Sequence, residues 1–171
     1  MRQDPDEISK DLTPALFQRT RSSCCTVRNP GDDRCSGIAP DQPTITRTGI
    51  RVEHGAWQID ARAEEQTIRL FEVENPAVEQ CLLTYRAELK AEDLRGRAFL
   101  QMWCRLPGRG EFFSKGFQQA VSGTVDWAHY EIPFYLKRDQ KPDLIKLNVV
   151  VEGTGTVWLR NVEVLKTPLA S

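Results

Sequence analysis

The sequence predicts an all-β domain, built as an antiparallel sandwich or barrel. From about residue 46 onward, apolar and polar residues alternate with a period of two, which is typical of half-buried strands. Turn-forming pairs such as Asn75-Pro76 and Pro107-Gly108 interrupt this alternation at short intervals. No long stretch shows the period of an amphipathic helix. The expected strands are 47–54, 56–61, 67–74, 79–89, 97–106, 111–121, 127–137, 143–152 and 156–165, with the first two counted as one if they form a single bent strand.

Residues 1–45 differ from the rest of the chain and predict an N-terminal arm. They are rich in proline and carry the polar stretches NPGDD and APDQP. Only DEISKDLTPALFQ has helical character, and Pro14 limits the length of a helix there. We therefore expect a mostly irregular arm over 1–45, with one short helix at most, either extended or packed along a β-sandwich domain over 46–171.

The composition excludes several classes of partner. The chain has 171 residues, with 23 basic and 24 acidic side chains interspersed, so there is no basic patch for a nucleic acid. No apolar run reaches the ~18 residues that a spanning helix needs, and direct membrane insertion is not expected. The first residues, MRQDPDEISKDL, are polar and acidic rather than a secretory signal. The compartment stays open, and an extracytoplasmic or cell-envelope setting is favoured if a signal has been removed.

The cysteines and histidines predict neither a metal site nor a cofactor site. No C-x-x-C pair occurs, and His54 and His129 are isolated, whereas a zinc site needs about four ligands. Cys35 could form a disulfide with Cys24 or Cys25, or all of these could be thiols.

The strands 79–89 and 97–106 can be placed in register as a hairpin around the segment KAEDLR. Cys81 then lies opposite Cys104 on the core side, and we expect both sulfurs to be protected in the folded protein, as a disulfide or as buried thiols. Sequential strands of a Greek key can instead lie in different sheets. The predicted core side carries Cys81, Leu83, Tyr85, Ala87, Leu89, Ala98, Leu100, Met102, Cys104 and Leu106.

The other side of 97–106 carries a mixed aromatic and polar set of residues. Aromatic planes, amides and guanidinium groups suit a sugar ring, which offers C–H groups and hydroxyls. The hairpin would add Arg86 to this side, and Tyr135 faces outward from 127–137. The alternative is that the arm or a partner covers Trp103. The candidate ligand-binding residues are Trp103, Arg105, Gln101, Arg86, Phe99 and Tyr135.

The second half of the chain resembles a known family. The stretches GTVDWAHYEIPFYL, LIKLNVVVEG and GTVWLRNVEVL are similar to the closing half of the galactose-binding-like jelly roll, found in carbohydrate-binding modules and related bacterial envelope domains. The resemblance covers roughly residues 79–165 and implies a two-sheet antiparallel jelly-roll sandwich with a non-catalytic binding role. The matching positions are Trp127, Gly153, Gly155, Val157 and Leu159.

One position departs from the family pattern. Many members carry an acidic pair in the last strand, often near a structural calcium, and Arg160-Asn161 stand there in this chain. Asp60, Asp126 and Glu163 are the remaining oxygen donors, and we do not expect a calcium site from them.

No catalytic motif competes with a binding role. The chain has no G-x-S-x-G, no H-E-x-x-H and no phosphate-binding glycine loop. Glu111 and Glu131 are a carboxylate pair of the kind that glycosidases use, and the alternation places Cys104 in the core, away from substrates. The sequence therefore predicts a non-catalytic module that binds a polysaccharide or other glycan. The alternative is a structural or protein-interaction sandwich with a protein partner.

Overall fold

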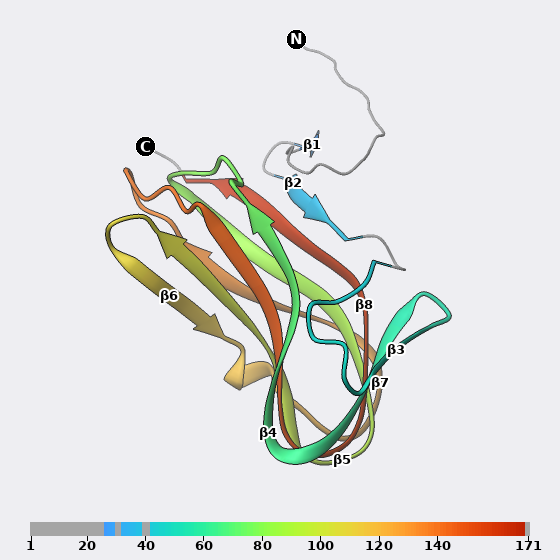
Figure 1. The fold of residues 1–171 in the computed structure, drawn as a ribbon. Coiled ribbons are helices and arrows are strands. Elements are labelled where there is room, and N and C mark those ends of the chain that lie inside the picture. The colour runs from blue at the N-terminus through green and yellow to red at the C-terminus, as the bar shows by residue number, and fades with distance from the viewer. Residues whose placement is uncertain (1–25, 30–31, 39–41, 170–171) are drawn as a thin grey trace.

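The structure, a computed structural model, describes residues 26–29, 32–38 and 42–169 of the chain. Within these residues the regular elements are strands, apart from one short 3₁₀ helix, which confirms the all-β prediction (Figure 1). The elements are β1 (Thr26–Asn29), β2 (Asp32–Gly37), β3 (Ile50–Glu53), β4 (Ala56–Glu74), β5 (Cys81–Leu106), β6 (Gly110–Lys115), the 3₁₀ helix η1 (Phe117–Gln119), β7 (Val121–Tyr135) and β8 (Leu144–Pro168).

Three strands, β4, β5 and β8, are long and bent, and each contributes to both layers of the sandwich (Figure 1). The expected hairpin around KAEDLR is therefore wrong, because 79–89 and 97–106 belong to the two halves of the single strand β5. β5 pairs antiparallel with β8 along nearly its whole length. A polar break in a period-two pattern can mark a bend as well as a hairpin turn. The expected strands 56–61 and 67–74 likewise join in β4, and 143–152 and 156–165 join in β8.

The bends divide the strands into two layers. Layer A consists of β6, residues 97–106 of β5, residues 144–152 of β8 and residues 65–74 of β4, in this order. Layer B consists of β7, residues 81–92 of β5, residues 156–168 of β8, residues 56–63 of β4, and β3 at the edge.

Glycines permit the bend where β5 and β8 cross from one layer to the other. Gly96 pairs with Gly153, and both have positive φ angles, +126° and +118°. A Cβ added to Gly96 would lie 1.8 Å from the Glu152 carbonyl oxygen, and one added to Gly153 would lie 1.8 Å from the Arg95 carbonyl oxygen. No side chain fits in either place, so these residues must be glycine for the strands to approach.

The core lies between the layers and contains the residues that the alternation predicts. Cys81 and Cys104 are buried thiols, as expected, although they come from opposite layers rather than from adjacent strands. Burial raises the pKa of the Cys104 thiol to about 12, and nearby Cys81 adds to the effect. The Tyr85 hydroxyl of layer B donates a hydrogen bond across the core to the Asn148 carbonyl of layer A, at 3.3 Å. This contact links the two layers across the core.

The described part of the arm contacts the sandwich domain. β2 pairs with β1 and with residues 163–166 of β8. Ile45 and Thr46 donate backbone hydrogen bonds to the carbonyls of Leu70 and Arg69 in β4, at 2.9 and 2.8 Å. The expected helix around Pro14 and the disulfide question at Cys24 and Cys25 lie outside the described residues. None of the described residues forms a helix that is long and apolar enough to cross a membrane.

Candidate functional site

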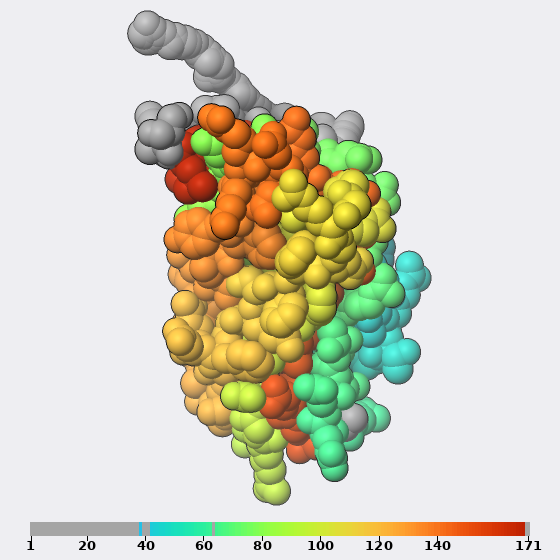
Figure 2. Space-filling model, turned by 90° about the vertical axis from the view of Figure 1, so that its left-hand side faces the viewer, coloured from blue at the N-terminus to red at the C-terminus, as the bar shows by residue number. Residues whose placement is uncertain are grey.

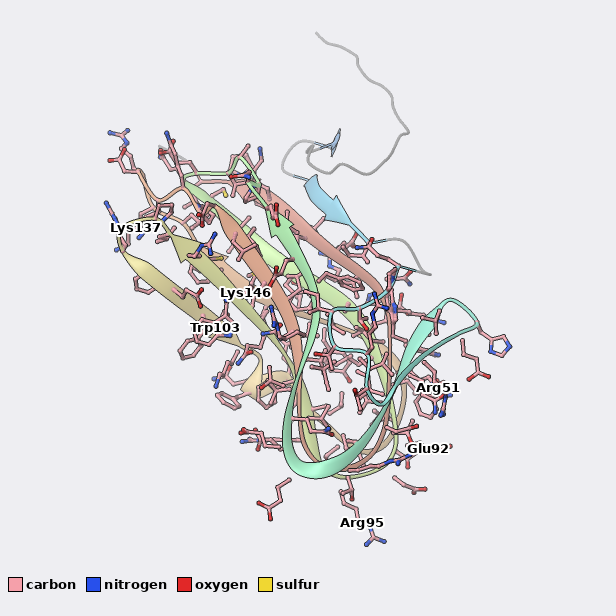
Figure 3. All side chains as sticks on the ribbon, viewed as in Figure 1. Arg51, Glu92, Arg95, Trp103, Lys137 and Lys146 are labelled. Atoms are coloured by element: carbon pink, nitrogen blue, oxygen red, sulfur yellow. The ribbon has the colours of Figure 1, made fainter. Side chains whose placement is uncertain are left out.

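The outer face of layer A brings side chains from four strands into rows. β5 directs Phe99, Gln101, Trp103 and Arg105 outward, as the alternation predicts. The register places Lys146 and Phe113 on either side of Trp103, from β8 and β6. Figure 2 looks onto this side of the molecule, with β6 in yellow. In Figure 3, Trp103 and Lys146 lie on this side, and Arg51 lies on the other.

Aromatic rings form the exposed apolar part of this face. The Trp103 and Phe113 ring centroids are 5.0 Å apart with an interplanar angle of 48°. Phe99 is buried and packs against Phe117 at 4.6 Å. Phe113, beside Trp103, and Phe117, beside Phe99, are 54% and 46% exposed, so both rings present part of their surface to solvent.

Two buried amides lie next to these rings. The Asn148 side chain donates a 2.9 Å hydrogen bond to the Gln101 side-chain oxygen, and each residue is only 5% exposed. One bond between two primary amides uses one donor and one acceptor. The Gln101 amino group and the Asn148 side-chain oxygen make no other side-chain hydrogen bond to any described residue. A buried polar group without a hydrogen-bond partner costs free energy. We therefore expect a water or a ligand hydroxyl to bond to this pair.

Ion pairs neutralise most charges of this face. Lys146 Nζ lies 2.9 Å from a Glu111 carboxylate oxygen, a contact that spans from β8 to β6 across β5. Arg105 Nε lies 2.8 Å from an Asp143 carboxylate oxygen, and hydrogen bonding to the guanidinium lowers the pKa of Asp143. Arg69 pairs with Glu72 at 2.9 Å and Arg97 with Glu152 at 3.0 Å.

Four of the six candidate residues, Phe99, Gln101, Trp103 and Arg105, share this face, and two do not. Arg86 and Tyr135 belong to layer B, so the expectation that they join Trp103 is wrong. Arg86 pairs there with Glu131 at 2.9 Å and Glu163 at 3.6 Å. The error follows from the hairpin, which placed the two halves of β5 side by side in one sheet.

Sequence reasoning missed Phe113, Lys115 and Phe117. Alternation along 111–115 could have found the first two, since the turn at 107–110 makes β6 the direct neighbour of β5. Phe117 follows the end of the strand and has no periodic signal.

The outer face of layer B also carries aromatic rings: Tyr135, which is 63% exposed, and two indoles that each lie beneath a cation. The Arg160 guanidinium lies 4.0 Å from the ring centroid of Trp127, and the Lys90 ammonium lies 5.0 Å from that of Trp158. Arg160 also pairs with Glu88 at 2.9 Å.

The structure places the two carboxylates considered as a glycosidase pair apart from each other. Glu111 and Glu131 lie on the outer faces of different layers, and each pairs with a cation. Cys104 is buried in the core. Among the described residues, no cluster of three or more His, Cys, Asp or Glu side chains could hold a metal ion.

A hollow of about 330 Å³ lies between the loops that follow β4 and β7. Glu79 and Lys141 line it and form an ion pair at 3.7 Å, and no aromatic ring lines it.

The part of the arm that the structure describes does not cover Trp103. Residues 45–46 bond to the outer edge of β4, two strands away from β5, and β2 pairs with the layer B half of β8. A cover formed by residues 1–25 lies outside the described residues.

The fold is similar to that of known carbohydrate-binding modules. The xylan-binding domain CBM22-1 of Xyn10C from Paenibacillus barcinonensis aligns with a TM-score of 0.55 and 11% identity, covering 84% of this chain and 100% of that domain. A family 4 module aligns with a TM-score of 0.46 and 16% identity, over 70% of this chain and 76% of the other. No family model and no curated protein matches the sequence. The first similarity shows a shared β-sandwich fold, as the resemblance implied.

Proposed function

We propose that this protein is a non-catalytic carbohydrate-binding module whose ligand lies on the outer face of layer A. The observation that carries the proposal is the half-buried ring of Trp103 and the exposed ring of Phe113 beside the buried amides of Gln101 and Asn148, which have hydrogen-bonding capacity left over. The shared fold supports the proposal, because the similar domain from Paenibacillus barcinonensis is a xylan-binding domain.

The two parts of this face match the two parts of a sugar. A pyranose ring has an apolar C–H surface that can stack on an aromatic plane, which gives contact area and fixes orientation. Its hydroxyls both donate and accept hydrogen bonds. The Gln101 amino group can donate to such a hydroxyl, and the Asn148 oxygen can accept from one, either directly or through water.

The carboxylates of this face favour binding over hydrolysis. Glycoside hydrolysis needs one carboxylic acid that protonates the leaving group and a second carboxylate that acts as base or nucleophile. Glu72 and Glu111 each lie 2.9 Å from a cation instead. This arrangement orders the face without supplying a proton donor.

The test is a screen of the protein against oligosaccharides, followed by titration of the best ligand with two tryptophan variants. Removing a central stacking aromatic typically costs ~2 kcal/mol or more, so Trp103→Ala should weaken binding by roughly thirtyfold or more. Trp158→Ala is the matched control, because Trp158 is also a partly exposed indole but belongs to layer B. Thermal unfolding of each variant separates loss of affinity from loss of fold.

Two results would overturn the proposal. One is the absence of binding to any oligosaccharide at millimolar concentration, which would favour the structural or protein-interaction alternative. The other is equal affinity of Trp103→Ala and wild type, which would place the ligand elsewhere.

A further inference from the structure

One row of the layer A face contains cations and amides but no acid. Across the layer, the register aligns Arg69 of β4, Asn148 of β8, Gln101 of β5 and Lys115 of β6. The neighbouring row holds Trp103 and Phe113, so an aromatic surface runs directly beside this row of hydrogen-bond donors.

Lys115 is the cation of this row whose charge is not balanced. The other cations on the layer A strands, Arg69, Arg97, Arg105 and Lys146, each pair with a carboxylate. Within the described residues, Lys115 instead lies over two rings, 5.1 Å from the Phe113 centroid and 5.4 Å from that of Phe117. These contacts hold the ammonium in place and leave its positive charge for a ligand.

The Gln101 amide lies directly opposite Lys115 in the β5–β6 register. Its amino group is the donor left over from the bond with Asn148. The β5–β6 pair therefore offers an ammonium and an amide N–H to the same ligand group, next to the Phe113 ring. A carboxylate is the sugar substituent that accepts from both and balances the charge, and hydrogen bonds to an ionised group are the stronger kind.

We propose that this face prefers acidic glycans, and that Lys115 and Gln101 bind the carboxylate of a uronic acid residue that lies next to the Trp103–Phe113 ring pair. This inference rests on the proposed function, since it names the ligand class of the same face.

The test compares an oligogalacturonate with the same oligosaccharide after reduction of its carboxyl groups, which removes the charge and keeps the backbone. We expect the acidic form to bind at least about tenfold more tightly, in line with a hydrogen bond to a charged group. Lys115→Met keeps the apolar stem over the rings and removes the charge, and it should bring the two affinities within about threefold of each other. Salt at about 1 M should shrink the wild-type preference in the same way.

Lys90→Met is the matched control, because Lys90 also lies over an aromatic ring, Trp158, but belongs to layer B. It should leave the preference for the acidic form intact. Equal or tighter binding of the neutral form would overturn this inference while the proposed function stands. A preference that survives in Lys115→Met would overturn the assignment to Lys115. If neither form binds and no other glycan does, the proposed function fails as well.

Discussion

The two outer faces of the sandwich carry similar types of residue, but they differ in how far these residues satisfy one another's hydrogen bonds and charges. On layer B, Arg160 lies over Trp127 and also pairs with Glu88. Its guanidinium therefore covers the ring and balances the charge of the carboxylate. On layer A, Phe113 is 54% exposed and the amide pair beside it keeps donors and acceptors to spare. An aromatic ring on a sheet therefore does not define a binding site by itself. What distinguishes layer A is the bonding capacity that its neighbours leave unused.

The largest expected effect comes from breaking the bend that separates the two faces. Gly96→Ala places a Cβ 1.8 Å from the Glu152 carbonyl oxygen at a φ of +126°. We expect it to lower the free energy of unfolding by more than about 3 kcal/mol, because backbone must move to make room. Urea unfolding measures the change, and failure to fold would be the extreme form of the same result.

Gly108→Ala is the control for this substitution. Gly108 also has a positive φ, +76°, but no atom lies within 4 Å of an added Cβ. The variant should lose only about 1–2 kcal/mol, the cost of a left-handed residue. Equal losses for the two variants would show that the close approach at the bend does not matter.

The sequence predicted the faces of single strands well and the relation between strands poorly. Alternation fixes which residues of one strand share a side, so Phe99, Gln101 and Trp103 were placed together correctly whatever the topology. Arg86 was misplaced because its position depends on long-range pairing, and the segment KAEDLR does not show whether the chain turns back or bends. Gly153 closely approaches the backbone of Arg95, which is distant in the sequence. A pattern of residues along the chain does not reveal which distant segments come together.

A substitution with a smaller expected effect tests whether the cations of layer B stabilise the fold. Arg160→Met removes the ion pair with Glu88 and the cation over Trp127, and should cost about 1–2 kcal/mol of unfolding free energy. Its glycan affinity should equal that of wild type. Lys115→Met on layer A should show the reverse, with less than about 0.5 kcal/mol of lost stability and a clear loss of acidic-glycan affinity. Matching losses of stability in the two variants would remove the distinction between the faces.

The smallest expected effect is a change in the free energy of unfolding at acidic pH. Burial by itself would raise the pKa of Glu88, but hydrogen bonds from Asn161 and Arg160 outweigh it and hold the pKa below its usual value of 4.5. A carboxylate with a lowered pKa stabilises the fold above pH 4.5, and this contribution is lost as the pH falls through the folded pKa. The stability advantage of wild type over Glu88→Gln should be a few tenths to about 1 kcal/mol at neutral pH and shrink below pH 4.5. A difference that does not change with pH, in urea unfolding from pH 3 to 7, would contradict this account of Glu88.

The most direct test of the ligand face is an NMR titration that follows the indole N–H signals of the four tryptophans. Trp103 reports on layer A, Trp127 and Trp158 report on layer B, and the buried Trp57 reports on the core. Addition of a bound oligosaccharide should shift the Trp103 signal in proportion to saturation and leave the Trp127 and Trp158 signals in place. A titration that shifts Trp127 or Trp158 and leaves Trp103 unchanged would contradict the assignment of the ligand to layer A.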